Sequence, residues 1–205
     1  MENRAEDPAS VVAPSIVERR LAESARTLLR LAETQRDAIV AAGKLCAAAI
    51  ASGNKILLCG NGGSAADSQH IATELVVRLS SAFNRAALAA IALTTDTSLL
   101  TACANDFGFE HVFERQIEAL GKAGDVLVAI TTSGKSKNCV LALHRARSLG
   151  LKSVLLSAGT GGECAALADA SVLVPAQDTG HIQEAHIATG HIIAEIVERS
   201  VCGRR

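Results

Sequence analysis

Short apolar runs alternate along this chain with longer segments in which apolar residues recur at helical spacing. The apolar runs have the length of buried strands, and they lie at residues 56–59, 87–93, 125–130, 152–157 and 171–175. Helical segments separate these runs and close the chain; they begin at residue 64 or 65 and recur at 110–120, 138–149, 164–168 and 182–201. Strands that alternate with helices predict a parallel sheet covered on both faces, with ligands beyond the carboxyl ends of the strands. We therefore expect an α/β fold, a three-layer sandwich around a five-stranded parallel sheet, with residues 94–109 as a loop or broken helix.

The chain before the first strand has a different pattern. Residues 1–14 contain two prolines and mixed charge, and we expect a flexible arm there, followed by a single domain at residues 15–205. Apolar spacing predicts two helices at residues 16–34 and 35–51. These helices have no strand of their own to cover, so we expect part of their apolar surface to pack against another subunit. A homo-oligomer is the consequence.

Composition excludes several classes of function. The 205 residues carry a formal net charge of −1, which gives no electrostatic reason to expect nucleic acid or an anionic membrane as a partner. The lack of Trp and Tyr argues against base stacking. The longest apolar run, residues 86–93, is too short to span a bilayer, and the N-terminus lacks the apolar core of a secretory signal. Six dispersed cysteines without a CxxC pair favour reduced thiols in a cytoplasmic protein.

Candidate chemistry begins where the first predicted strand ends. The sequence CGNGGS at residues 59–64 joins that strand to an Ala-rich segment with high helix propensity. Glycines let the backbone approach a ligand closely, and a helix that starts at Ser64 or Ala65 offers unpaired N–H groups to an anion. The loop is a candidate cradle for an oxyanion or a phosphate. On the helix, His70 and Glu74 lie four residues apart and share one face, so they can act on the same small molecule.

A purely structural explanation of these residues stays open. Glycine-rich turns between strand and helix are common in α/β folds, and the spacing matches neither GxGxxG nor GxxxxGK[ST]. A His and a Glu four residues apart are often no more than a solvated helix pair.

A second polar loop, TTSGKS at residues 131–136, follows the third predicted strand. It contains a cation, Lys135, and four hydroxyls, which belong to Thr131, Thr132, Ser133 and Ser136. Hydroxyls, backbone N–H groups and a helix N-terminus together suit a phosphate monoester dianion. Ordinary N-capping explains one hydroxyl and leaves the other three unexplained. We therefore expect this loop to bind phosphate.

The last predicted helix contains polar groups within a largely apolar segment. At about 100° per residue, Glu184 and His191 share a face, Gln183 lies within reach of it, and His186 points elsewhere. A single buried histidine is more often structural than catalytic, and His186 fits that description. The remaining histidines carry no signal of their own; they are His111, His144 and His181.

Five motifs together resemble the sugar isomerase (SIS) domain family. They occur in the family's order, from CGNGGS at 59–64 through HIATE at 70–74, NDFGF at 105–109 and TSGKS at 132–136 to IQEAH at 182–186. The resemblance extends from about residue 16 to residue 200. It implies a flavodoxin-like SIS fold and a homotetramer with active sites at subunit interfaces. It also implies isomerisation of D-sedoheptulose 7-phosphate to D-glycero-D-manno-heptose 7-phosphate, the first step of ADP- or GDP-heptose synthesis for bacterial surface glycans.

The resemblance also implies roles for individual residues. Contacts with the sugar fall on Asn61, Gly62, Gly63, Ser64, Glu74, Asn105, Asp106 and Gln183. Contacts with the phosphate fall on Thr131, Thr132, Ser133 and Ser136. One Zn²⁺ per subunit would be held by His70, Glu74, Gln183 and His191. Glu74 and His191 match the acid/base pair.

The chemistry of isomerisation agrees with this assignment. A proton moves between C1 and C2 through an enediol, which requires a base near the carbon and an acid or Lewis acid at the oxygens. Glu74 fits the base and His191 the proton donor, whereas a carboxylate bound to zinc is a weaker base. Two positions depart from many relatives: His181 replaces an Arg before the IQE motif, and Lys135 replaces a neutral Asn.

Two alternatives stay open within the same resemblance. One is a non-catalytic SIS protein that binds a phosphosugar or the bacterial replication initiator; such relatives lack the groups found here at Glu74 and His191. The other is an isomerase of a different phosphosugar, which only substrate trials distinguish.

Overall fold

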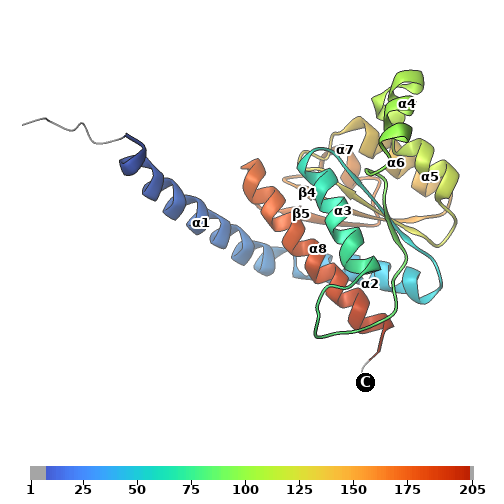
Figure 1. The fold of residues 1–205 in the computed structure, drawn as a ribbon, viewed down its shortest axis with the longest axis horizontal. Helices are drawn as coiled ribbons and strands as arrows, with labels where there is room; N and C mark the ends of the chain where they lie inside the picture. The colour runs from blue at the N-terminus through green and yellow to red at the C-terminus, as the bar shows by residue number, and fades with distance from the viewer. Residues whose placement is uncertain (1–7, 204–205) are drawn as a thin grey trace, which may run out of the picture.

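The computed structural model describes residues 8–203, with side chains from residue 13 onward. Its centre is one sheet of five parallel strands in the order β2-β1-β3-β4-β5 (Figure 1). The strands are β1 (Ile56–Gly60), β2 (Ala90–Ala92), β3 (Val126–Ile130), β4 (Lys152–Ala158) and β5 (Ala170–Val174). The strand order reverses between β1 and β3, which creates the crevice where ligands bind in open α/β sheets. The predicted α/β fold with five parallel strands is confirmed.

Helices cover both faces because successive strand residues point to opposite sides of the sheet. Ile56 and Leu58 face a core formed with α2 (Arg36–Ala51), α3 (Gly63–Val76) and α8 (Thr179–Val201). Leu57 and Cys59 face a second core. That second core is completed by residues of α4 (Thr97–Phe107), α5 (Glu114–Leu120), α6 (Lys137–Ser148) and α7 (Gly162–Ala165). The 3₁₀ helix η1 (Phe109–His111) lies between α4 and α5 and has no buried residue. The runs at β1 and β3 are fully buried and therefore apolar throughout.

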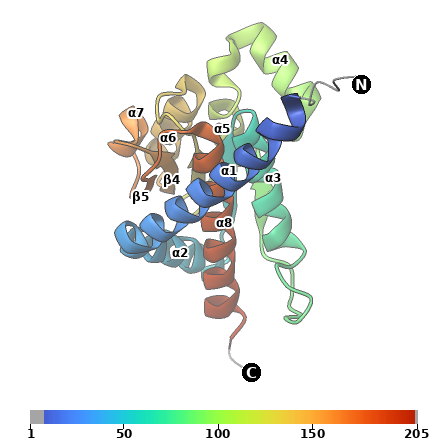
Figure 2. The same cartoon turned by 90° about the vertical axis from the view of Figure 1, so that its left-hand side faces the viewer.

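The N-terminal helices differ from the expectation. Helix α1 (Pro8–Thr34) begins inside the segment expected as an arm and includes Pro14; residues 1–7 lie outside the described part of the chain. Helix α2 packs on the sheet, with Ile39 and Cys46 in the first core. The view that both helices lack a sheet to cover is therefore wrong for α2, whose apolar residues face β5 and α8. Figure 1 shows α1 projecting from the body of the protein, and Figure 2, seen from the side of its free end, shows α1 in front of α8.

Two other segments differ from the sequence-based expectation. Residues expected as a loop or broken helix form α4, because the Asp96 carboxylate accepts the backbone N–H of Leu99 at 3.0 Å and caps the helix. Strand β2 is shorter than the apolar run that predicted it, since the N–H of Leu88 donates to the carbonyl of Leu75 on α3 instead of a strand. In the described part of the chain no helix is long and apolar enough to cross a membrane.

Candidate functional site

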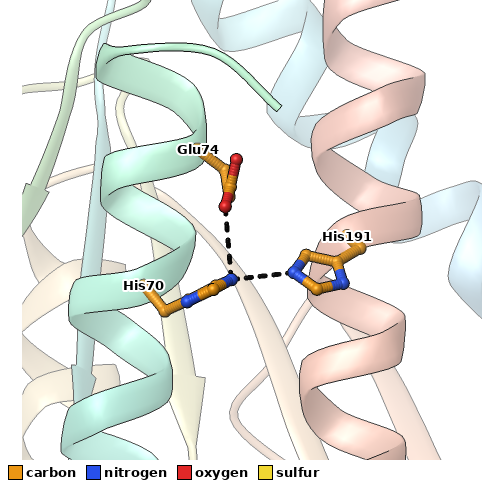
Figure 3. Close-up of side chains that lie close together, drawn as sticks. All are labelled: His70, Glu74 and His191. Carbon is orange, nitrogen blue, oxygen red and sulfur yellow. Dashed lines mark hydrogen bonds and ion pairs between the residues drawn. The ribbon is translucent and has the colours of Figure 1, made fainter. Parts of the chain in front are cut away.

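Helices α3 and α8 lie side by side and bring His70, Glu74 and His191 together (Figure 3). The Nε2 atoms of His70 and His191 are 2.8 Å apart, and Nε2 of His70 is 3.3 Å from Oε1 of Glu74. Glu74 is mostly shielded, with 18% of its side chain exposed, whereas 48% of the His70 side chain is exposed. A base held at the edge of solvent beside two imidazoles is a suitable arrangement for moving protons on a bound small molecule.

The close approach of the two helices depends on glycine at position 190 of α8. A Cβ on Gly190 would lie 2.4 Å from Cδ1 of Ile71, so a larger residue would require either a shift of the Ile71 side chain or a wider separation of α3 and α8. Ile71 itself is buried and follows His70 directly. The spacing that brings His70 to His191 is therefore set by a neighbouring packing contact.

The three side chains form a group that could hold a metal ion. One ligand atom from each of His70, Glu74 and His191 lies within 4.8 Å of the others. Two imidazole nitrogens and a carboxylate oxygen are ligands that Zn²⁺ accepts. Of the predicted metal ligands, these are the ones that the described geometry brings to one point.

Gln183, the fourth predicted ligand, lies at the start of α8 and contacts the start of α3. A Cβ on Gly63 would lie 2.5 Å from Nε2 of Gln183. Gly62, which precedes α3, has a φ of +55°, a conformation that glycine adopts without strain. At Gly63 the glycine loop (residues 60–63) therefore presents its backbone, without a side chain, to Gln183. Helix α3 begins at Gly63, within a residue or two of the predicted start.

Burial shifts the pKa of one titratable group on α3 and of one on α8. Burial raises the pKa of Asp67, one turn before His70, although the nearby His70 opposes the shift. Oδ2 of Asp67 is buried and has no hydrogen-bond partner among the described residues. Burial lowers the pKa of His186, whose Nε2 lies 3.1 Å from the carbonyl oxygen of Ser157. His186 is fully buried and belongs to the core, as its position on α8 predicted.

The glycine loop and the hydroxyl loop (residues 131–136) meet at the crevice between β1 and β3. The side-chain amides of Asn61 and Asn138 exchange two hydrogen bonds of 2.9 and 2.8 Å. Asn138 is buried in the first turn of α6, directly after the hydroxyl loop. Sequence reasoning missed Asn138, and its only signal was an amide side chain at the start of a predicted helix.

The hydroxyl loop is ordered by its own contacts. Oγ1 of Thr131 and Oγ of Ser136 are 3.1 Å apart, and the backbone N–H of Lys135 donates to Oγ of Ser133 at 3.2 Å. Gly134 has a φ of +65°, and a Cβ there would lie 2.0 Å from the carbonyl oxygen of Gly161. The loop after β3 thus packs tightly on the loop after β4. The Lys135 side chain is exposed.

The remaining predicted residues lie at different places. Ser64 is buried in the first turn of α3, where its carbonyl oxygen accepts the hydroxyl of Ser68 at 2.8 Å. Thr132 is half-buried in the hydroxyl loop. Asn105 and Asp106 are exposed on α4 and hydrogen-bond to each other at 2.8 Å. The described hydrogen bonds of those two side chains join neither of them to the histidine cluster.

His181, treated as background from the sequence, is a buried anchor. Its Nδ1 lies 3.0 Å from Glu184, and its Nε2 lies 3.3 Å from Glu23 on α1. The hydrogen bond with Glu184 raises the pKa of His181. Arg20 and Asp178 add an ion pair of 2.9 Å between the same helices. The partner Glu23 lies 158 residues away in sequence, so no local pattern could have revealed this role.

Comparison with known proteins adds an independent line of evidence. The sequence model of the SIS domain family matches residues 21–158. The chain is 50% identical over 182 residues to the phosphoheptose isomerase of Aquifex aeolicus, covering 89% of this chain and 94% of that one. It is 51% identical over 160 residues to that of Akkermansia muciniphila, covering 78% and 84%.

Solved structures agree with the sequence relatives. The structure of the phosphoheptose isomerase of Neisseria gonorrhoeae is similar with a TM-score of 0.84 and 41% identity, covering 91% of this chain and 98% of that one. That of a phosphoheptose isomerase from Francisella tularensis has a TM-score of 0.87 and 32% identity, with the same coverage.

Proposed function

The chain belongs to the SIS-domain family, and on this premise we propose that it is an aldose–ketose isomerase that converts D-sedoheptulose 7-phosphate into D-glycero-D-manno-heptose 7-phosphate. The observation that carries the proposal is the convergence of Glu74, His70 and His191 between α3 and α8. This reaction needs a base and an acid around two adjacent carbons, and the cluster supplies both.

Glu74 acts on carbon and His191 on oxygen. The Glu74 carboxylate removes a proton from C1 of the ketose, and the electrons of that C–H bond form the C1=C2 double bond of an enediol. His191 donates a proton to the former carbonyl oxygen at C2. Glu74 then returns its proton to C2, and the C1 hydroxyl gives its proton to His191, which yields the aldehyde and restores both side chains to their starting protonation states. Atoms and electrons balance within the sugar, so no oxidant or reductant is required.

The phosphate end of the substrate binds at the hydroxyl loop. Thr131, Ser133 and Ser136 offer hydroxyl donors, and Thr132 adds a fourth. The N-terminus of α6 directs its free N–H groups toward the same loop. Asn61, Gly62, Asn105 and Asp106 are proposed contacts of the sugar chain.

We propose one Zn²⁺ per subunit, held by His70, Glu74, Gln183 and His191. The donor set fits, because the nitrogen and oxygen atoms of three of these residues already converge within 4.8 Å. Bound zinc would supply a Lewis acid for the oxygens of C1 and C2. Glu74 would then be both a zinc ligand and the base. The effect of a chelator on turnover tests whether the reaction requires Glu74 as a ligand.

We propose a homotetramer with active sites at subunit interfaces, and the apolar surface of α1 supports the association of subunits. Several of its large apolar side chains are exposed, including Leu21 at 67% and Leu29 at 66%. Such residues become buried when subunits associate. The cysteines of the described chain are all free thiols, which supports a cytoplasmic location. There the product would enter nucleotide-activated heptose synthesis.

The decisive experiment is to incubate the purified protein with D-sedoheptulose 7-phosphate and to follow the aldose by NMR, with added zinc and with a chelator. We expect turnover that is lost in Glu74→Gln and retained in Glu195→Gln, an exposed glutamate of α8. Loss of turnover with chelator and recovery with zinc would support the metal. A folded wild-type protein that binds the sugar phosphate without converting it would overturn the proposal, in favour of another substrate or a binding role.

A further inference from the structure

A buried ion pair joins α8 to the segment that follows α3. Nε of Arg85 lies 2.7 Å from Oε1 of Glu198, and only 2% and 4% of the two side chains are exposed. Arginine and glutamate are rarely buried this fully unless their charges are paired and their hydrogen bonds are satisfied. The pair lies outside the cluster of His70, Glu74 and His191.

Arg85 also binds the backbone of Glu74. Its Nη2 donates to the carbonyl oxygen of Glu74 at 2.7 Å, and its Nη1 donates to the carbonyl of Ala86 at 2.9 Å. The Glu74 carbonyl lies in the last turn of α3, where carbonyls have no partner within the helix. A cation is also favoured at a helix C-terminus by the helix dipole. The guanidinium therefore caps the helix that carries the proposed base.

Glu198 connects the same contact to the proposed acid. It follows His191 by seven residues on α8, close to two helical turns, so the two side chains leave the same face of that helix. Oε1 of Glu198 also accepts the backbone N–H of Leu79 at 3.2 Å. One guanidinium thus contacts the peptide of Glu74 on one side and the His191 face of α8 on the other.

We propose that Arg85 is a positioning residue that, through its buried pair with Glu198, holds α3 against α8 and so sets the position of Glu74 relative to His191. This inference rests on the proposed function of these two residues. The contact of Gly190 with Ile71 limits how closely α3 and α8 approach each other. The contacts of Arg85 with Glu198 and with the Glu74 carbonyl prevent the two helices from separating. Misplacement of a reacting group by about 1 Å can cost on the order of 100-fold in rate.

The test replaces the pair as a unit, because removal of one charge leaves the other buried and destabilises the fold. The double variant Arg85→Met, Glu198→Leu fills a similar volume with apolar side chains. It removes every hydrogen bond of the Arg85 guanidinium and of the Glu198 carboxylate. The matched control is Arg199→Met with Glu195→Leu, an exposed ion pair on the same helix. Circular dichroism and urea unfolding identify variants that remain folded.

Two measurements separate positioning from simple stability. In the folded Arg85/Glu198 variant we expect kcat to fall about 10- to 100-fold. We expect KM to stay within about threefold of the wild-type value, because the hydroxyl loop that binds the phosphate is unchanged. In the metal-free protein, ¹⁵N NMR of the imidazoles reports the 2.8 Å contact between His70 and His191, and we expect those signals to shift. The control variant should match the wild type in both measurements.

The outcomes are distinguishable. A folded Arg85/Glu198 variant with wild-type kcat and unchanged imidazole signals would overturn the positioning role of Arg85 and would leave the proposed function unaffected. A wild-type protein without isomerase activity would overturn the proposed function, and the imidazole signals would still decide whether Arg85 sets the spacing of α3 and α8. A further variant, Arg85→Lys, keeps the positive charge but lacks the planar guanidinium that reaches both Glu198 and the Glu74 carbonyl. It should therefore also have a lowered kcat.

Discussion

Gly63 and Gln183 are in direct contact, such that a Cβ on Gly63 would lie 2.5 Å from Nε2 of Gln183. This contact joins the first turn of α3 to the first turn of α8. Two turns farther along, His70 meets His191 between the same helices. Because Gly63 has no side chain, the Gln183 amide can lie directly against the first turn of α3.

Gly63→Ala should displace the Gln183 amide and lower the affinity for zinc by about 10- to 100-fold, as for other disturbed metal sites. Competition with a chromogenic chelator measures that affinity. The same substitution in a Gln183→Ala background should have a much smaller effect, because the displaced side chain is gone. Equal losses in both backgrounds would contradict the role given to Gly63.

The paired amides of Asn61 and Asn138 should be needed to bind substrate. Asn138→Leu keeps a similar volume but leaves the Asn61 amide without its partner. We expect a loss of about 1–3 kcal/mol of unfolding free energy and a higher KM. Urea unfolding and steady-state kinetics measure the two effects, and Asn84→Ala, at an exposed asparagine, is the control. An unchanged KM in a folded Asn138→Leu protein would show that the glycine loop keeps its shape without this pair.

Asp125 should make stability depend on pH in the acid range. Burial raises the pKa of Asp125, but hydrogen bonds from the Lys55 ammonium and from the N–H groups of Lys55 and Lys122 outweigh burial and hold the pKa below its usual value. A lowered pKa contributes stability above the unfolded value of about 3.9, and this stability is lost as pH falls through the folded value.

Asp125→Asn should accordingly lose about 1–3 kcal/mol at pH 7 and show a flatter loss of stability below about pH 4. Urea unfolding at a series of pH values measures this dependence. The exposed Glu33→Gln variant should keep the wild-type profile. If Asp125→Asn follows the same curve as the wild type, the pKa of Asp125 is not lowered in the folded protein.

Thiol reactivity should distinguish Cys202 from the other cysteines. Cys202 is half-exposed, whereas the other five are buried. Burial raises the pKa of Cys46 to about 12 and that of Cys164 to about 12, which leaves almost no thiolate at neutral pH. Titration with a disulfide reagent should give one fast thiol in the native protein and five more in denaturant. Cys202→Ser should remove the fast phase, and a second fast thiol would contradict the burial.

The local sequence pattern was sufficient to locate most of the helices and strands and the loops between them. Fully buried strands are continuous apolar runs, so β1 and β3 could be located from the sequence, and the turn at residues 60–63 from its glycines. His70 and Glu74 could be paired because helical spacing is fixed within one element. Helix α4 was underestimated because its Asp96 cap was not recognised.

Contacts between elements depend on which helix faces meet, and sequence spacing does not contain that information. The site roles of Gln183 and His191 came from family resemblance, and only the packing of α8 on α3 brings His191 to His70 and Gln183 to Gly63. The pairing of Asn61 with Asn138 required two loops to meet at the sheet crevice. His181 and Arg85 looked ordinary because their partners, Glu23 and Glu198, lie more than a hundred residues away. The sequence by itself therefore determined the elements and the chemical groups, and tertiary packing decided which groups act together.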